Sequence, residues 1–399
     1  MSELILQRLK SLMAQRGIDA ALAYGGANFM LSTGFQNYFD NPAASMALIP
    51  ASDRSQSLMI VSNWTAQAAK AAANIDVIES FPLWLEIADI NDIRNGSAAR
   101  SEKPTRYDPE ANIQRLANAI QERGWGRGTI AIEMALISAQ VFEWLRKKLP
   151  DVTFVNGADL FFEARKIKSS AEVEMLREAT RYAEGGLKRI TETSITGFDV
   201  ARLKLIYDEF CIERAKANPE SGFQGTRVTA SIGEDISPTV IGGAKASADT
   251  LVFFDCGASI RGYGSDTGRT LTLSPPTREA RNIMDALRRG MDAAFALVKP
   301  GARLSDIFHA GQDAVRASGL DWYSRGHIGH AMGIGMGEMP PFIGPKDDSV
   351  LEVGMVMALE TPLYVRGLGG FQIEECFVVT ETGYDPLTSL PRDFLPATA

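Results

Sequence analysis

Two aspartates in a largely apolar stretch carry charges that need a partner. Residues 251–273 read LVFFDCGASIRGYGSDTGRTLTL, in which two β-rich arms flank a glycine-containing middle. This pattern predicts an antiparallel hairpin. A turn centred between Ile260 and Arg261 would set Asp255 opposite Asp266, with their Cβ atoms about 5 Å apart. Opposed like charges destabilise a sheet, so an aspartate in an apolar strand must be paired, protonated or bound to a cation, and a pair of metal ions would resolve the conflict. In the alternative interpretation one aspartate lies in a bulge that faces water.

Two glutamates farther along the chain interrupt β-like segments in the same way. Glu360 ends the apolar run MVMALE, and Glu374 follows the residues GFQI. The two positions are symmetric about Gly367, so a second hairpin would present a second opposed pair of acids. Glu375 alternates to the other face of that strand, where we expect a solvated or ion-paired side chain.

The chain contains three histidines, and any histidine-dependent chemistry must use them. His309 lies in the helical pattern SDIFHAGQDAV and is expected to be structural. His327 and His330 lie in the glycine-rich segment SRGHIGHAMGIGMGEMP, where the backbone can approach a ligand closely. On a strand the two rings would face opposite sides, so they need not bind the same ion.

These residue types together favour a centre for divalent metal ions. Carboxylates and an imidazole suit Mn²⁺, Co²⁺, Fe²⁺ or Zn²⁺. Four carboxylates can balance two such ions. Two ions about 3.5 to 4 Å apart acidify a shared water and stabilise both the attacking and the departing oxygen of a hydrolysis. The residue types are therefore compatible with a centre of two ions, which is an arrangement that supports hydrolysis.

Periodicity and capping signals predict the elements that position these residues. An α/β pattern opens with a helix over residues 1–17 and a strand over residues 18–24, and it continues to about residue 162. From residue 165 the pattern becomes helical, with Ser169 or Ser170 as a possible N-cap. A domain boundary between residues 160 and 168 follows. Further helices are predicted at residues 198–217, 278–298 and 304–318.

Length, charge and cysteine content narrow the class of protein. A chain of 399 residues is long enough for two globular domains. The net charge of −8 argues against nucleic acid or an anionic membrane as a partner and favours a small molecule or a peptide. No apolar run approaches the roughly 20 residues that span a bilayer, and the opening segment is an amphipathic helix rather than a signal peptide. Three widely spaced cysteines indicate neither a disulfide framework nor a cysteine-ligated zinc site, so we expect a cytoplasmic protein.

Five motifs occur in a fixed order: RKIKSSAEVEMLREA, DCGASIRGYGSDTGRT, GHIGHAMGIG, GMVMALETPLY and GGFQIEECFVVTETG. In these motifs the chain resembles the creatinase/methionine aminopeptidase superfamily, whose pita-bread fold includes Xaa-Pro aminopeptidases and dipeptidases. The resemblance implies an α/β N-terminal domain over residues 1–162, like that of creatinase and prolidase. It implies an α+β pita-bread catalytic domain over residues 163–399, with a curved antiparallel sheet of pseudo-twofold symmetry and helices outside, in a homodimer.

The resemblance also implies roles for particular residues. Two divalent metal ions, with manganese among the candidates, would be held by five side chains: Asp255, Asp266, His330, Glu360 and Glu374. Asp266 and Glu374 would bridge the ions, and Glu360 would manage protons for a bridging hydroxide that attacks a carbonyl. His327 matches a histidine that lines the prolidase substrate pocket. Further candidates for substrate binding, chosen by their closeness in sequence, are Tyr263, Tyr323 and Arg325.

Four positions depart from the pattern of the peptidases. Thr239 and Gly337 stand where those enzymes have histidines. Gln372 stands where they often have arginine, and Gly268 where they usually have threonine. The set of metal ligands is thus complete, while the donors that hold a peptide oxyanion are missing. Loss of one such donor commonly lowers the rate about a hundredfold or more.

Three functions follow as alternatives. The leading one is hydrolysis of the C–N bond of a small amide or dipeptide. The second is a metal-dependent lyase or ring-opening amidohydrolase acting on a small zwitterion, as in the dimethylsulfoniopropionate lyase and ectoine hydrolase of the superfamily. The third is a non-catalytic binding module, although superfamily members of that kind tend to lose metal ligands.

Residues 33–39 read TGFQNYF and place three aromatic side chains among turn formers. One interpretation is a loop folded onto the core beside it, and the other is a lid over a ligand. The resemblance adds a third hypothesis, in which the aromatics of residues 35–39 close the pocket of the partner subunit in a dimer.

Overall fold

The computed structural model describes residues 3–38, 44–85, 87–97, 108–234, 243–335 and 339–398. The chain divides into two compact units, Met1–Arg165 and Lys166–Ala399, and each unit has its own sheet. None of the described helices is both long enough and apolar enough to pass through a bilayer.

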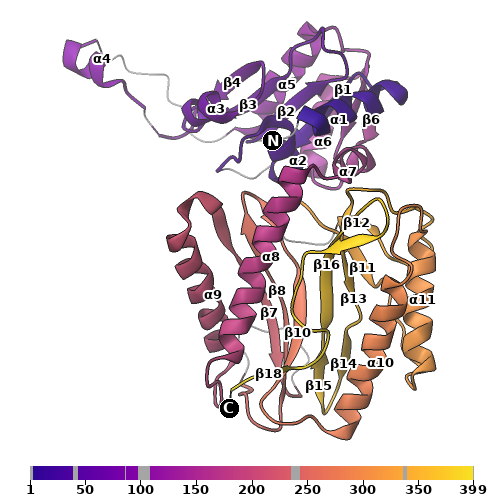
Figure 1. Ribbon diagram of the computed structural model, residues 1–399. Coiled ribbons are helices and arrows are strands. Elements are labelled where there is room, and N and C mark those ends of the chain that lie inside the picture. The colour runs from indigo at the N-terminus through magenta and orange to yellow at the C-terminus, as the bar shows by residue number, and fades with distance from the viewer. Residues whose placement is uncertain are drawn as a thin grey trace. The chain divides into compact units, whose positions relative to one another are not determined.

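The first unit is an α/β domain around a mixed sheet with the strand order β4-β3-β2-β1-β5-β6 (Figure 1). Strand β1 pairs antiparallel with β2 and parallel with β5. The strands are β1 Ala20–Tyr24, β2 Met46–Pro50, β3 Leu58–Ser62, β4 Val77–Phe81, β5 Thr129–Ile132 and β6 Thr153–Asn156. The helices are α1 Glu3–Gln15, α2 Gly26–Thr33, α3 Ala66–Ala72, α4 Ile90–Asn95, α5 Pro109–Glu122, α6 Ala139–Lys148 and α7 Ala158–Arg165.

The local sequence explains how this unit begins. Helix α1 ends at Gln15, and Gly17 then adopts a φ of 64°, which glycine tolerates without strain. Strands β1, β2 and β3 are buried at every position, which is why they read as nearly continuous apolar runs. The predicted opening helix and the strand that follows it are confirmed.

The aromatic residues after α2 have different surroundings. Phe35 is buried, as expected for a loop folded onto the core. Tyr38 is exposed, and its ring packs edge-on against Trp64, with 5.2 Å between the ring centroids. Phe39 lies outside the described residues.

The second unit is a curled sheet of ten strands with helices outside it. All of its strands pair antiparallel except β18, which pairs parallel with β10, and the main strand order is β12-β11-β13-β16-β10-β8-β7. The strands on this path are β7 Phe223–Ile232, β8 Leu251–Ile260, β10 Thr267–Thr272, β11 Gly329–Ala331, β12 Met339–Phe342, β13 Val356–Glu360 and β16 Ile373–Val379. Three further strands extend the sheet: β9 Tyr263–Gly264, β17 Tyr384–Pro386 and β18 Leu395–Pro396. A separate small hairpin consists of β14 Leu363–Val365 and β15 Gly369–Phe371.

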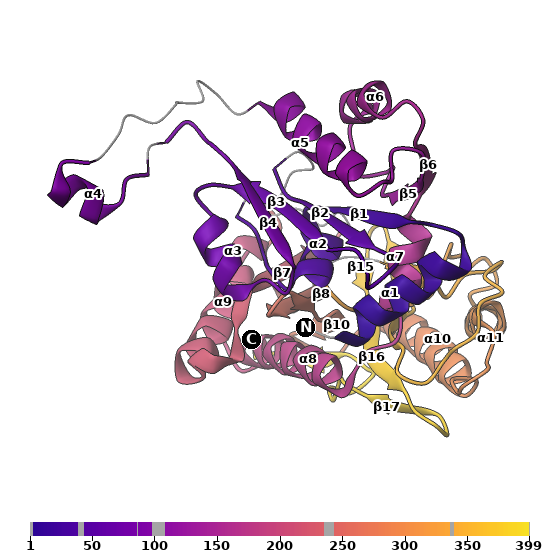
Figure 2. The same ribbon diagram turned by 90° about the horizontal axis from the view of Figure 1, so that it is seen from above.

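The two halves of this unit repeat the same order of elements. The first half runs through α8 Ser170–Thr191, α9 Val200–Ala217, the 3₁₀ helix η1 Pro219–Ser221, and strands β7, β8 and β10. The second runs through α10 Arg278–Phe295, α11 Leu304–Ala317, and strands β11, β13 and β16. The halves meet where β10 pairs with β16, and each helix pair accompanies its own half of the sheet (Figures 1 and 2). This arrangement accounts for the expected pseudo-twofold symmetry.

Capping explains where the helices of the second unit begin. Ser169 is the N-cap of α8 and forms a reciprocal capping box with Glu172. Asp199 and Thr277 accept the same kind of backbone hydrogen bond at the starts of α9 and α10. The four helices predicted from sequence in this region are confirmed, with Ser169 rather than Ser170 as the cap.

The first predicted hairpin forms, but its predicted register is wrong. Asp255 pairs with Gly268 rather than with Asp266. The turn residues are Arg261 and Gly262, whose φ values of 50° and 87° are the positive pair that a two-residue type I′ turn requires. The turn therefore lies one residue later than predicted. Asp255 and Asp266 become diagonal neighbours on one face of the sheet, where they can still approach each other.

The second predicted hairpin has the predicted register. Glu360 of β13 pairs directly with Glu374 of β16. The β14–β15 hairpin continues the same symmetry and turns around Gly367, which has a φ of 80°. The direct opposition of the two glutamates is confirmed.

Candidate metal centre

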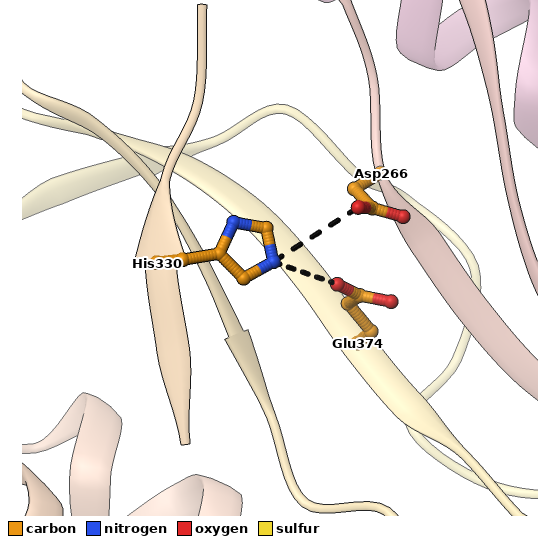
Figure 3. Close-up of side chains that lie close together, drawn as sticks. All are labelled: Asp266, His330 and Glu374. Carbon is orange, nitrogen blue, oxygen red and sulfur yellow. Dashed lines mark ion pairs between the residues drawn. The ribbon is translucent and has the colours of Figure 1, made fainter. Parts of the chain in front are cut away.

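Three buried side chains converge at the middle of the curled sheet (Figure 3). Asp266 lies between β9 and β10, His330 on β11 and Glu374 on β16. His330 Nε2 lies 3.9 Å from Asp266 Oδ2 and 3.7 Å from Glu374 Oε1. One ligand atom from each residue lies within 4.8 Å of the other two. We refer to these three residues as the central triad.

Contacts with neighbouring backbone carbonyls fix the positions of two triad residues, Asp266 and His330. The Cys376 thiol donates a hydrogen bond to the Asp266 backbone carbonyl at 2.8 Å, which ties β16 to the loop that carries this aspartate. His330 Nδ1 lies 3.3 Å from the Ala331 carbonyl oxygen, so its Nε2 faces the two acids. An imidazole held in this way presents a single nitrogen to an ion.

Burial makes the triad acids costly to ionise. It raises the pKa of Asp266 well above the ordinary range, and the neighbouring Glu374 and Asp255 raise it further. It likewise raises the pKa of Glu374, and Asp255 and Glu360 add to the effect. A divalent cation removes this cost, and the donor set of carboxylate oxygens and one imidazole nitrogen suits a divalent transition metal.

Asp255 lies beside the triad and contacts a cation from the chain itself. Arg227 of β7 places Nη2 2.9 Å from Asp255 Oδ1 and also contacts Asp266 Oδ1. Sequence reasoning missed Arg227. A signal for it existed, because an arginine within the strand FQGTRVTASI is hard to accommodate without a charged partner.

Glu360 is the fourth acid of the cluster and has three neighbours. Arg325 Nη2 donates to Glu360 Oε1 at 2.7 Å, and His327 Nδ1 lies 3.7 Å from the same oxygen. The Gln372 amide donates to Glu360 Oε2 at 3.3 Å and to Glu374 Oε2 at 3.2 Å. Gln372 therefore links the two opposed glutamates.

Gly268 and Gln372, two of the departures seen in the sequence, depend on each other. A Cβ added at Gly268 would lie 2.1 Å from Gln372 Cγ, which is far inside van der Waals contact. The glutamine can lie across the sheet because the residue beside it has no side chain. The other two departures, Thr239 and Gly337, lie outside the described residues.

The substrate candidates chosen from sequence lie in different places. His327 precedes β11, with its ring centroid 6.3 Å from that of His330. Tyr323 is buried, and its hydroxyl donates to the Pro362 carbonyl at 3.3 Å. The Tyr263 hydroxyl donates to Glu172 at 2.9 Å, so it holds the first turn of α8.

Tyr364 of β14 is a further residue near the acids that sequence reasoning missed. Burial raises its pKa to about 12, and the charge of Glu360 contributes to the rise. Its ring centroid lies 5.5 Å from that of Phe253. The residue as a whole is 43% exposed. The sequence signal available for Tyr364 was its position four residues after Glu360.

The structure also shows the surroundings of Glu375 and His309. Glu375 is buried and forms an ion pair with Arg269, so the ion-paired alternative is confirmed and the solvated one is wrong. Arg269 also donates to the carbonyls of Gly268 and Glu374 at 2.8 and 2.7 Å, which joins β10 to β16 behind the triad. His309 is exposed on α11, where its Nε2 lies 3.3 Å from the Pro345 carbonyl oxygen.

Two protein-family models match the chain. The Creatinase/Prolidase N-terminal domain matches residues 5–167, and Metallopeptidase family M24 matches residues 174–381. The second match spans more than half of the chain, so the chain belongs to metallopeptidase family M24. It is therefore a metal-dependent hydrolase of the creatinase and prolidase superfamily, as the sequence motifs predicted.

Individual relatives agree with this assignment. The chain is 28% identical over 303 residues to an Xaa-Pro dipeptidase of Lactobacillus helveticus, which covers 72% of this chain and 77% of the relative. It is 29% identical over 293 residues to the ectoine hydrolase of Halomonas elongata, covering 68% and 71%. The solved structure of an Xaa-Pro dipeptidase from Bacillus anthracis superposes with a TM-score of 0.80 at 19% identity, covering 98% of this chain and 99% of the other. The predicted pita-bread fold is confirmed.

Proposed function

We propose that the protein hydrolyses the C–N bond of a small amide or dipeptide with the help of two divalent metal ions, manganese being the first candidate. Asp255, Asp266, His330, Glu360 and Glu374 would hold the ions, with Asp266 and Glu374 shared between them. When bound, the ions would supply Lewis acidity and acidify a shared water. The observation that carries the proposal is the convergence of the central triad in a buried site.

The side chains around Glu360 would handle protons and substrate. Glu360 lies at the edge of the acid cluster, where its carboxylate can accept a proton from the attacking water. Arg325 and His327 both approach Glu360 Oε1, so they can orient this carboxylate and contact the substrate beside it. Tyr323 lies in the same neighbourhood, because the charges of Arg325 and Glu360 act on its hydroxyl.

A second candidate is a ring-opening amidohydrolase or a lyase that acts on a small zwitterion. Two observations favour it. The Gln372 amide lies where the peptidases often have an arginine, which changes the charge beside the opposed glutamates. The chain is also about as similar to an ectoine hydrolase as to an Xaa-Pro dipeptidase.

We also propose the context in which the enzyme works. Residues 1–162 would form the creatinase/prolidase-like N-terminal domain and residues 163–399 the catalytic domain. The three cysteines are buried and unpaired with one another, which fits a reducing cytoplasm. We expect a homodimer, and size-exclusion chromatography with light scattering would test that expectation.

A substrate panel with and without metal tests the proposed function. The panel compares Xaa-Pro dipeptides with small cyclic amides and betaines, assayed after metal removal and after addition of Mn²⁺. Turnover of a dipeptide that requires Mn²⁺ supports the first candidate, and turnover restricted to cyclic amides or betaines supports the second. Asp266→Asn should abolish turnover, whereas Asp385→Asn, which removes a surface carboxylate paired with Arg177, should not. Full turnover by Asp266→Asn would contradict both candidates.

A further inference from the structure

The chain contains two Asn-Gly pairs, Asn95-Gly96 and Asn156-Gly157. Such a pair can modify itself in water, because glycine has no side chain that shields its backbone nitrogen. This nitrogen attacks the carbonyl carbon of the asparagine side chain and forms a C–N bond, while the side-chain nitrogen and the displaced N–H proton leave as ammonia. Water then adds to either carbonyl of the cyclic succinimide and opens it to aspartate or to isoaspartate, in which the chain continues through the side-chain carbon.

Exposure to water does not distinguish the two pairs, because Asn95 and Asn156 are both exposed. The attack requires the backbone between asparagine and glycine to rotate until the side-chain carbon faces the glycine nitrogen. Hydrogen bonds that hold this nitrogen in a helix or between strands oppose the rotation. The contacts of Gly96 and Gly157 therefore determine which pair reacts.

The first pair lies at the end of α4 and is held only by that helix. Asn95 is the last residue of α4, and the Gly96 N–H donates to the carbonyls of Asp92 and Ile93, which belong to the same helix. Helix α4 has six residues, none of which is buried, and it lies apart from the sheet of its unit (Figures 1 and 2). A helix this short has little stability without packing, so it opens readily and frees the Gly96 nitrogen.

The second pair is held by contacts with other elements. Asn156 ends β6, and the Gly157 N–H donates to the carbonyl of Ile132 at the end of β5, at 2.7 Å. The Asn156 side chain accepts a hydrogen bond from the backbone N–H of Ala158 at 3.2 Å, at the start of α7. A Cβ added at Gly157 would lie 3.1 Å from Ala131 Cβ, so the backbone here is closely packed. Freeing the Gly157 nitrogen therefore requires β6 to separate from β5.

We propose that Asn95 is a site of spontaneous deamidation, because no packing holds the C-terminal end of α4, and that Asn156 is protected. The reaction replaces a neutral amide by a carboxylate. This charge lies at the negative end of the helix dipole and one turn after Asp92, so it destabilises α4 further. The proposal concerns the first unit alone and does not depend on the metal centre or on the proposed function.

Peptide mass spectrometry of the full-length protein, aged in mildly alkaline buffer, tests the proposal. Synthetic peptides of residues 89–97 and 152–160 serve as unstructured references for the two pairs. In the folded protein Asn95 should convert at a rate close to that of its peptide, whereas Asn156 should convert at least about tenfold more slowly than its own. Isoaspartate among the products, which an isoaspartyl methyltransferase detects, shows the cyclic route, because direct hydrolysis of the side-chain amide gives only aspartate.

Two controls complete the experiment. In urea strong enough to unfold the first unit, both pairs should react at the rates of their peptides. Asn95→Gln would have to close a larger and less favourable ring, so residue 95 should stay unmodified in this variant. An Asn95 that stays intact in the folded protein while its peptide converts would overturn the proposal. Equal rates at the two pairs in the folded protein would overturn the role assigned to the unpacked helix.

Discussion

Asp266 and Glu374 are acids whose burial would be unfavourable without a cation. Their carboxylates and the His330 imidazole come from three separate segments of the chain, yet one atom of each lies within 4.8 Å of the others. Nearby, Asp255 contacts Arg227 and Glu360 contacts Arg325, so each outer acid has a partner from the chain. The inner acids face the imidazole, while Asp266 also contacts Arg227 and Glu374 accepts a hydrogen bond from Gln372. We propose that a metal ion completes this set.

The three histidines should respond differently to replacement. His330→Ala removes the imidazole of the central triad, so metal affinity should fall by at least about tenfold and turnover should fall with it. His327→Ala leaves the triad intact and should lower turnover while the metal content stays the same. His309→Ala, on the exposed face of α11, is the matched control and should change neither. Elemental analysis beside initial rates distinguishes the cases. Unchanged metal affinity in His330→Ala would contradict the assignment.

At the level of single residues, much of the site could be predicted from the sequence. Acids that interrupt apolar strands are conspicuous, and Asp255, Asp266, Glu360 and Glu374 were predicted for that reason. Arg227 was not predicted, because it contacts acids outside its own strand. The alternation of residues within one strand does not show such contacts. The charge that an arginine brings into a strand was the signal available.

At the level of elements, the helices and the site-bearing strands follow closely from local signals. The capping box at Ser169 marks the start of α8, and the symmetric positions around Gly367 gave the register of the second hairpin. The first hairpin was misaligned because several turn centres were compatible with its sequence. The structure uses the pair Arg261 and Gly262, in which Gly262 adopts positive φ without strain while Arg261 adopts it as a non-glycine residue.

Packing between β10 and β16 leads to a testable coupling. Gly268→Ala would place a Cβ 2.1 Å from Gln372 Cγ, so we expect it to destabilise the second unit by about 1–3 kcal/mol. Gln372→Ala removes the Cγ, so the double variant should recover most of that loss. Gly243→Ala, at a position with open space around its Cβ, is the control. Denaturant unfolding of the four variants measures the coupling, and strictly additive effects would show that the two residues are independent.

At the level of the whole molecule, each unit has its own sheet and its own buried charges. The acid cluster belongs to the second unit, whereas the first unit buries Glu133. Asn28 donates a hydrogen bond to Glu133 and accepts one from Arg165 at 2.9 Å. Glu133 therefore gives the first unit a dependence on pH that does not involve the acid cluster.

Glu133 should make the stability of the first unit depend on pH. Burial raises its pKa to about 7, although Asn28 and Arg165 lower it in part. Because the folded pKa exceeds the unfolded value of 4.5, the contribution of Glu133 is complete below pH 4.5 and is lost as the pH rises through 7. Glu133→Gln removes this dependence and should stabilise the unit on the order of 2 kcal/mol at pH 8, with little effect at pH 4.5.

Thermal unfolding at pH 4.5 and pH 8 measures this difference. Glu143→Gln, at an exposed position on α6, is the control and should behave like the wild type at both pH values. An equal effect of Glu133→Gln at both pH values would show that the glutamate does not titrate between them.

The most direct test of the account is to locate the metal in crystals of the protein grown with Mn²⁺, using anomalous diffraction at the manganese edge. The account predicts a strong anomalous peak enclosed by Asp266 Oδ2, His330 Nε2 and Glu374 Oε1. A map without a peak among these three atoms, in crystals that hold Mn²⁺ elsewhere or not at all, would contradict it.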